Sequence, residues 1–354
     1  MANLDIKSIK FFTDHINFLM STGLAQDGNF DVLSGTDLIN TFNLGSEPEL
    51  FDMRPLNQCQ FETSENSTSR ADHVLINIDL NSNSFNCDYI AILNHNMSSS
   101  DAKIRIKSSN TESNVNNADM SGGTDISGVS EVVNADTISG NVVIPGTDGS
   151  TIFTFTSSTN RYWGLQFEGS NGQSSSVATD GTFDDNFDLK IGCILIGESY
   201  QMPHNPELSL RRTIIYDGIN IRQSLGGQKY TNASHLGRRF QNVRSKSPFS
   251  TATFAPGIYG GRIVYDLNFN YLSSSDIMPQ EYDTEDSDQD TVVSDVWNRT
   301  KGNLIPFIFS SDSTDTGDNA ERSYLFARFG QNELSMEQVA LNTFNISMRI
   351  EEEF

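Results

Sequence analysis

The sequence predicts an all-β protein with few short helices. Three observations lead to this prediction. Short apolar segments alternate with polar residues at a period of two, turn-forming residues separate them, and helical periodicity is nearly absent. The 354 residues exceed the size at which one hydrophobic core usually suffices, so we expect two domains. Hydrophobic residues make up 36% of the chain and include 23 Phe, a composition that excludes disorder throughout.

Residues 1–49 are expected to form an N-terminal arm and loops. Apolar residues between Ile9 and Met20 are irregularly spaced, which fits a short helix or an extended arm, and we favour the arm. Residues 24–50 are punctuated by Gly, Asp and Asn, which is typical of loops with brief strands.

Residues 50–202 predict a β-sandwich. The expected strands lie at 74–80, 89–93, 102–107, 151–155, 161–167 and 189–197. The run 89–93 is continuously apolar, as in a strand covered on both faces, whereas 102–107 alternates with its charged residues toward water. Residues 108–149 are almost all Ser, Asn, Asp, Gly and Thr. We therefore expect them to form a long polar surface loop with little burial in the core.

Pro203 and Pro206 mark the predicted boundary to a second β-rich unit, an assembly domain of residues 203–354. The strands expected here lie at 213–216, 219–224, 262–271, 305–309, 323–329 and 343–351, and a short helix is expected at 292–297. The first two strands are expected to form a hairpin that turns at Asp217 and Gly218.

No motif for phosphate, dinucleotide or zinc binding is present, so we expect no enzyme, no cofactor and no metal site. His95 is the most suggestive of the five histidines, but a catalytic acid or base also needs a partner, and the sequence identifies none. The acidic segment 281–290 has carboxylates for Ca²⁺ but lacks the glycine and final Glu of an EF-hand loop, so we favour a solvated charge run. The three widely spaced cysteines predict reduced thiols and folding in a cytoplasm.

The net charge of −23 repels phosphate groups, so we expect neither nucleic acid nor an anionic membrane as a partner. The chain shows no signal-peptide pattern and no apolar run long enough to cross a bilayer, so no membrane insertion is expected. Positive charge gathers in residues 207–262. The candidate subunit contacts there are Arg211, Arg212, Arg238 and Arg239, although an ordinary solvated surface explains them equally well.

Several stretches resemble structural proteins of tailed bacteriophages. Residues 88–106 resemble the first half of a galactose-binding-like jelly-roll module in phage tail proteins, through Tyr-Ile-Ala-Ile-Leu-Asn-His-Asn followed by Ala-Lys-Ile-Arg-Ile. Residues 161–198 resemble its second half. The segments 208–212, 226–230 and 346–353 are similar to parts of such virion proteins as well.

The resemblance implies a galactose-binding-like jelly roll at residues 50–202 and a structural subunit of the phage tail, tail tip or baseplate. Such a subunit folds in the host cytoplasm, is located in the virion, and assembles with copies of itself and with neighbouring virion proteins. The alternatives are a receptor- or carbohydrate-binding module with a host surface glycan as partner, a capsid decoration protein and, ranked last, a glycan-degrading enzyme. Exposure of Trp163 or Tyr162 would favour sugar binding, but their apolar alternation favours the core.

Overall fold

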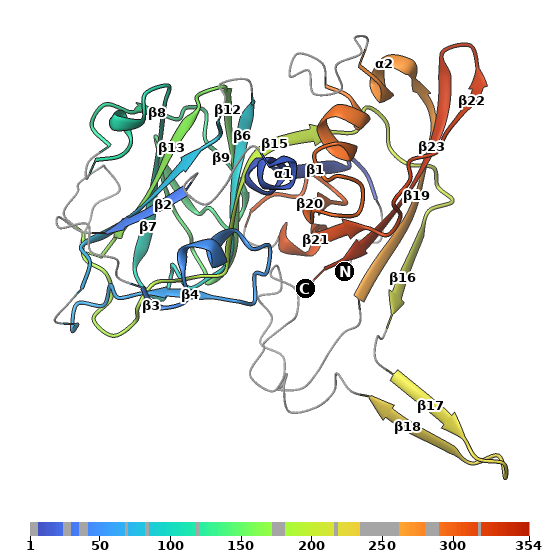
Figure 1. The fold of residues 1–354 in the computed structure, drawn as a ribbon, viewed down its shortest axis with the longest axis horizontal. Coiled ribbons are helices and arrows are strands. Elements are labelled where there is room, and N and C mark those ends of the chain that lie inside the picture. Colours follow the sequence, from blue (N-terminus) through green and yellow to red (C-terminus); the bar gives the residue numbers. More distant parts are fainter. Residues whose placement is uncertain are drawn as a thin grey trace.

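The structure is a computed structural model. It describes residues 6–23, 30–34, 42–67, 70–81, 85–117, 120–171, 181–215, 219–233, 262–279, 290–317 and 320–353. These residues confirm the all-β prediction, because antiparallel strands in several sheets make up most of the regular structure and the helices are short (Figure 1).

The largest sheet runs through the whole molecule. In spatial order its strands are β16 (Arg211–Ile215), β19 (Arg262–Ser273), β23 (Thr343–Glu352), β21 (Tyr324–Phe329), β20 (Phe307–Ser310), β1 (Lys10–Asp14), β15 (Cys193–Gln201), β6 (Cys87–His95), β12 (Gly149–Ser158) and β9 (Ser130–Val133). A further strand, β22 (Met336–Ala340), pairs with β23 outside this path.

The second sheet covers one half of the first. Its strands in spatial order are β10 (Thr137–Ser139), β11 (Val142–Ile144), β7 (Ala102–Ser109), β13 (Tyr162–Gly169), β5 (His73–Asp79) and β2 (Phe30–Ser34), and β8 (Thr124–Asp125) pairs with β7. A small three-stranded sheet consists of β14 (Lys190–Ile191), β4 (Cys59–Phe61) and β3 (Phe42–Leu44). A two-stranded sheet consists of β17 (Ile219–Gln223) and β18 (Lys229–Ala233).

The helical elements are brief. In the described residues they are α1 (His15–Thr22), α2 (Ser274–Ile277), η1 (Glu47–Phe51), η2 (Glu112–Asn114), η5 (Val292–Trp297) and η6 (Ala320–Ser323). The short helix predicted at 292–297 is confirmed as η5, which opens with the side chain of Thr291 accepting a hydrogen bond from the backbone of Ser294.

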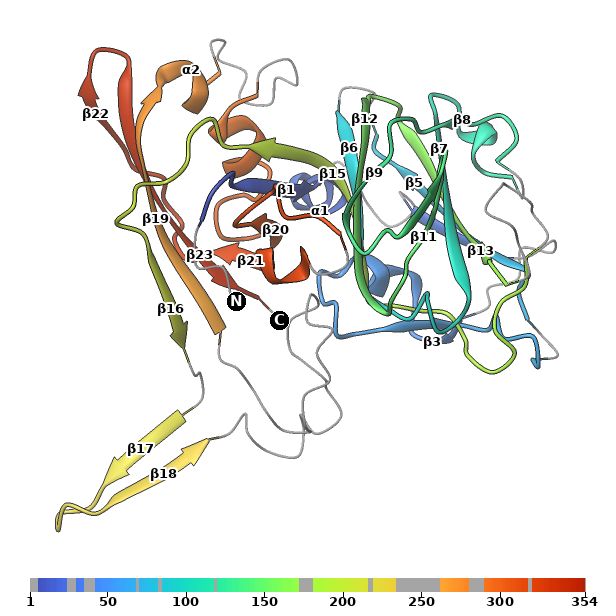
Figure 2. The same ribbon diagram turned by 180° about the vertical axis from the view of Figure 1, so that it is seen from behind.

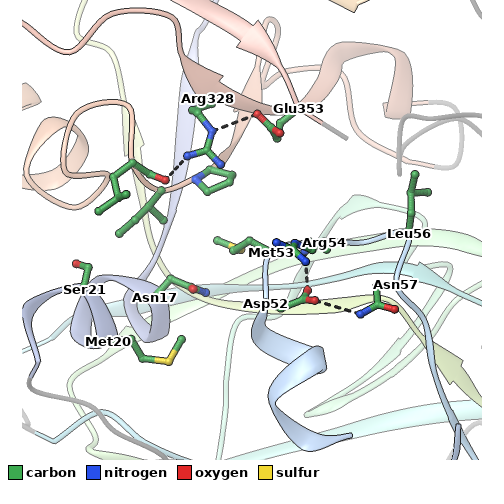
Figure 3. Close-up of a pocket in the computed structure, with 13 residues that line it drawn as sticks. Asn17, Met20, Ser21, Asp52, Met53, Arg54, Leu56, Asn57, Arg328 and Glu353 are labelled. Atoms are coloured by element: carbon green, nitrogen blue, oxygen red, sulfur yellow. Dashed lines mark hydrogen bonds and ion pairs between the residues drawn. The ribbon is translucent and has the colours of Figure 1, made fainter. Parts of the chain in front are cut away.

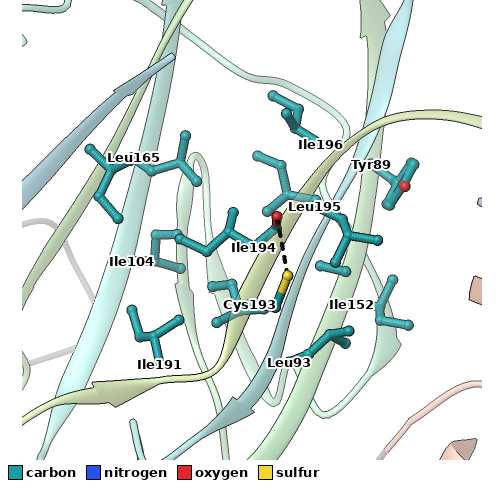
Figure 4. Close-up of a cluster of buried hydrophobic side chains, with 14 of the residues drawn as sticks. Tyr89, Leu93, Ile104, Ile152, Leu165, Ile191, Cys193, Ile194, Leu195 and Ile196 are labelled. Atoms are coloured by element: carbon teal, nitrogen blue, oxygen red, sulfur yellow. Dashed lines mark hydrogen bonds between the residues drawn. The ribbon is translucent and has the colours of Figure 1, made fainter. Parts of the chain in front are cut away.

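The two large sheets form a β-sandwich whose core is apolar. Side chains from β6, β12 and β15 meet those of β7 and β13, with Ile104, Leu165 and Ile194 fully buried (Figure 4). Trp163 is also fully buried, and its indole Nε1 donates a hydrogen bond to the carbonyl of Asn160 at 2.8 Å. The prediction that Trp163 belongs to the core is therefore confirmed.

Residues 10–22 differ from the extended arm that we expected. They form β1 and α1, and Asp14 between them caps the helix by accepting a hydrogen bond from the backbone N–H of Asn17 at 2.7 Å. β1 lies between β15 and β20 and pairs with both. Phe12 packs in the sandwich core, and Phe11 packs in a second hydrophobic cluster that includes Phe307, Phe309 and Phe329. The strand therefore joins two parts of the long sheet that lie far apart in the sequence.

The prediction of a long polar loop with little burial at 108–149 was wrong. This segment holds η2 and the strands β8 to β11, and most of its apolar side chains are buried. Val115 and Met120 pack over Gly164, where even a Cβ atom would lie 2.5 Å from the sulfur of Met120. A small number of well-placed apolar residues therefore anchors a segment whose composition is polar.

The hairpin predicted between strands at 213–216 and 219–224 was also wrong. β16 pairs with β19, and β17 pairs with β18 across a turn at residues 224–228. Asp217 and Gly218, the predicted turn, lie outside the described residues. The pairing partner of β16 thus comes from a strand about 50 residues further along the chain, which no local turn signal specifies.

Candidate assembly surface

The two edges of the long sheet differ in how they are covered. At one edge, β9 is covered by a loop, because the backbone N–H of Gly317 donates to the carbonyl of Val132 at 3.1 Å. At the other edge, β16 receives no such backbone bond from the described part of the chain on its outer side. An open edge strand can pair with another chain, so β16 is a candidate contact.

Arg211 and Arg212 lie on this open edge. Both side chains are exposed, and the guanidinium of Arg212 lies 5.6 Å from the ring centroid of Tyr265 on the neighbouring strand. Ile214 on the same strand is 55% exposed. The other two predicted contacts, Arg238 and Arg239, lie outside the described residues. The structure thus places two of the four predicted arginines on an exposed edge strand, with their side chains on opposite faces of the sheet because they are consecutive.

The β17–β18 hairpin projects away from the rest of the protein (Figures 1 and 2). Its apolar side chains are open to solvent: Ile221 and Tyr230 are each 58% exposed, and Leu225 at the tip is fully exposed. Residues 219–233 include Arg222 and Lys229 and no acidic residue. Because an isolated two-stranded hairpin is marginally stable in water, this arm would gain stability from packing against a partner.

Exposed large apolar side chains are spread along this part of the protein, from the β17–β18 hairpin at one end to the β22–β23 turn at the other (Figure 1). Among the described residues, 10 of the 14 that are most exposed lie on or beside β16 to β19 and the β22–β23 turn: Leu208, Ile214, Ile221, Leu225, Tyr230, Tyr271, Met278, Met336, Val339 and Leu341. Surfaces of this kind mark sites of interaction with other macromolecules. We call this side of the protein the assembly surface.

A pocket of about 770 Å³ lies away from the assembly surface, and the sequence analysis did not find it (Figure 3). α1 contributes Met20, the segment after η1 contributes Asp52 to Asn57, and β21 and the end of β23 contribute Arg328 and Glu353. The first two segments lie about 30 residues apart, and the residues from β21 and the chain after β23 follow more than 250 residues later. No local motif brings them together, so no sequence signal marks this pocket.

The polar groups of the pocket are largely engaged with each other. The carboxylate of Asp52 accepts hydrogen bonds from the backbone of Arg54 at 2.7 Å and the amide of Asn57 at 3.2 Å, and burial raises its pKa. The Nε of Arg328 lies 3.1 Å from a carboxylate oxygen of Glu353. The described residues contain no group of three or more potential metal ligands.

His95 has a structural environment. It is buried in the sandwich, where its Nε2 lies 2.8 Å from the hydroxyl of Thr151 and its Nδ1 accepts a hydrogen bond from the backbone of Met97. Burial lowers the pKa of His95 to about 4. We considered the acidic segment 281–290 as a Ca²⁺ site, and its residues 281–289 lie outside the described part of the chain.

Comparisons with known proteins leave the function open. No family model and no curated protein matches the chain. Among solved structures, the chain is similar to a chitosan-binding module derived from a chitosanase/glucanase of Paenibacillus sp. IK-5, with 14% identity over 48% of this chain and 96% of that chain. The TM-score is 0.30, at which the likeness carries no argument. No helix in the described residues is long and apolar enough to span a membrane.

Proposed function

We propose that this chain is a structural subunit of a tailed-phage virion, in the tail, tail tip or baseplate, that acts by assembling with copies of itself and with neighbouring virion proteins. The observation that supports assembly most directly is the assembly surface, with its open edge strand β16 and the projecting β17–β18 hairpin. The virion context rests on the resemblance of residues 88–106 and 161–198 to phage tail proteins.

Electrostatics favour a contact between the assembly surface and a second copy. The hairpin contributes two positive charges to a chain of −23, so the rest of the chain carries −25. Copies repel one another at long range, but the cationic hairpin and the arginines of β16 can approach an acidic face. Such complementarity sets orientation, whereas apolar and strand-edge contacts supply most of the affinity.

Trp163 and Tyr162, the two residues whose exposure would favour sugar binding, do not support the carbohydrate-binding alternative. Trp163 is buried, and Tyr162 is half-buried with the guanidinium of Arg161 lying 4.8 Å from its ring centroid. Trp163 therefore has no free face for a sugar, and Arg161 covers one face of Tyr162.

Self-association of the purified full chain tests the proposal. We expect sedimentation velocity to show an oligomer that grows with concentration, and electron microscopy to show closed or stacked particles. The double substitution Arg211→Glu and Arg212→Glu should raise the concentration needed for association at least tenfold, because like charges across a contact cost several kcal/mol or so. A chain that stays monomeric at every concentration would contradict the proposed function.

The matched control reverses the same number of charges elsewhere. Arg70 and Arg322 form surface ion pairs with Glu65 and Asp315, away from β16 and the hairpin. Arg70→Glu with Arg322→Glu changes the net charge equally, so it should leave association close to that of the wild type. Equal weakening in both double variants would show a general charge effect rather than a contact at β16.

A further inference from the structure

The β17–β18 hairpin ends in a turn whose polar groups bond within the hairpin. The N–H of Ser224 donates to the carbonyl of Gln228 at 2.8 Å, and the N–H of Gly227 donates to the carbonyl of Ser224 at 2.9 Å. Two side chains add to the turn. The hydroxyl of Ser224 accepts from the N–H of Gln228 at 3.1 Å, and the amide of Gln223 donates to the carbonyl of Gly227 at 3.2 Å. Because the turn satisfies these groups itself, it gives up few hydrogen bonds on leaving water.

Apolar side chains are exposed at the end of this hairpin and on both of its faces. Leu225 is fully exposed in the turn. Ile221 pairs with Thr231, and Arg222 pairs with Tyr230, so Ile221 and Tyr230 point to opposite faces of the hairpin. Both side chains are more than half exposed. A flat protein surface would cover only one of these faces, whereas a lipid layer surrounds a thin projection that enters it.

The charge of this part of the chain favours an anionic partner. Residues 218–265 contain seven Lys and Arg and no Asp or Glu, although the 354 residues of the chain include 46 Asp and Glu. In the hairpin, Arg222 and Lys229 lie beside the turn, one on each strand, and both are exposed. Cations next to an exposed apolar tip are typical of segments that contact anionic lipid headgroups.

The hairpin also holds its tip away from the acidic remainder of the protein. Both views show it extending away from the two large sheets (Figures 1 and 2). At about 3.3 Å per residue, residues 219–225 span about 20 Å, whereas salt at physiological concentration screens charges over about 8 Å. The net charge of −23 led us to expect no anionic membrane as a partner. That charge is largely screened at the tip, where the local charge is positive.

We infer that the tip of the β17–β18 hairpin inserts into the surface of a bilayer that contains anionic lipids. Leu225 enters the interfacial layer first, and Arg222 and Lys229 lie at the level of the headgroup phosphates. One tip buries few side chains and binds weakly, but copies that assemble with their hairpins on one side add their contacts. The inference goes beyond the proposed function, because a single chain can make this contact while β16 stays open to a second copy.

Flotation of the purified full chain with lipid vesicles tests the contact. We expect the chain to float with vesicles of equal parts phosphatidylcholine and phosphatidylglycerol, and to float far less with phosphatidylcholine alone. Leu225→Asp should lower the lipid partition coefficient by about tenfold or more, because it removes the apolar side chain of the tip and adds a negative charge. The matched control is Leu341→Asp, at the exposed turn between β22 and β23, which should bind like the wild type.

A second pair of variants separates local charge from net charge. Arg222→Glu with Lys229→Glu should also lower the partition coefficient by about tenfold or more, since each cation near an anionic surface contributes to binding. Arg70→Glu with Arg322→Glu changes the net charge equally, away from the hairpin, and should have far less effect. Equal losses in the two double variants would show a general charge effect and would contradict insertion of the tip.

A fluorescent probe shows which turn enters the lipid. An environment-sensitive dye attached to Leu225→Cys should brighten with the anionic vesicles and be quenched by lipids that carry a nitroxide group. The same dye on Leu341→Cys should show neither effect. The three native cysteines are buried, so the dye reacts with the introduced thiol.

The outcomes also distinguish a lipid from a protein partner. Failure to float with anionic vesicles, or equal flotation of Leu225→Asp and the wild type, would overturn the inference. A dye at position 225 that brightens with rising protein concentration in the absence of vesicles would overturn it as well, because the tip would then dock on a second copy. Sedimentation of the wild type without lipid tests the proposed function separately, and neither result there changes what the vesicle assay measures.

Discussion

Replacing Phe11 by Ala should destabilise the protein strongly, because this side chain connects β1 to the second hydrophobic cluster. Phe11 is fully buried, and its ring centroid lies 5.6 Å from those of Phe307 and Phe309 and 6.2 Å from that of Phe329. Truncating a buried phenylalanine costs about 3–5 kcal/mol, and three aromatic neighbours place this site toward the upper end.

The two tryptophans allow the effect to be followed in each cluster separately. Trp163 belongs to the sandwich core, and Trp297 packs against the cluster that contains Phe11, 5.1 Å from the ring centroid of Phe329. In a Trp163→Phe background, urea unfolding followed by fluorescence reports on the second cluster alone. With a slope of about 3 kcal/mol per M, a loss of about 4 kcal/mol lowers the midpoint by more than about 1 M.

The comparison with Trp297→Phe makes the test decisive. In the Trp297→Phe background, the fluorescence of Trp163 reports the unfolding midpoint of the sandwich core. Phe11→Ala should lower this midpoint less than it lowers the midpoint reported by Trp297, or by the same amount if the two clusters unfold as one unit. A Trp297 midpoint that moves by less than about 0.3 M, the equivalent of about 1 kcal/mol, would refute the assignment of β1 as the strand that joins the clusters.

Two further predictions concern β15. Glu198→Gln should raise the melting temperature at pH 8 relative to the wild type and leave it similar at pH 5. Burial, with the nearby charge of Asp295, raises the pKa of Glu198 to about 8, so the folded state keeps a proton that the unfolded chain releases near pH 4.5, and stability falls across that interval. A difference in melting temperature between pH 5 and 8 that is as large in the variant as in the wild type would contradict this. Gly197→Ala should lower stability by about 1–3 kcal/mol or more, since its Cβ would lie 1.9 Å from the carbonyl of Thr13, whereas Gly226→Ala, with no atom nearer than 3.9 Å, should have little effect in the same thermal scan.

The sandwich strands could be predicted from the sequence because their pattern is local. The run 89–93 and the alternation at 102–107 each indicate a strand, and the structure has strands at both places. The prediction that the charged residues of 102–107 face water was wrong for Lys103 and Arg105, which are buried and form ion pairs with Glu168. Residues 108–149 were misjudged for the opposite reason. Their overall composition is polar, but stability there depends on where single residues such as Met120 pack.

The pairing of strands that lie far apart in the chain could not be predicted from the sequence. The Asp-Gly pair at 217–218 indicated a hairpin, whereas β16 pairs with β19. The irregular apolar spacing of residues 9–20 did not reveal a strand followed by a helix. The side chains of this segment pack in two hydrophobic clusters, and each element is too short to show the period of a strand or of a helix clearly. Only the tertiary structure brings α1, Asp52 and Arg328 to one pocket.

The position of β1 also sets the order in which the chain can fold during synthesis. Phe12 pairs in register with Ser199 on one side and Ile308 on the other, so its partners are made about 190 and about 300 residues later. At about 5–20 residues per second, the ribosome needs about 15 seconds to one minute to reach the second partner. When the hairpin at 219–233 has been made, β1 can already pair with β15, but β20, its partner on the other side, has still to be synthesised. The arm is thus available to a neighbouring chain before its own long sheet has closed.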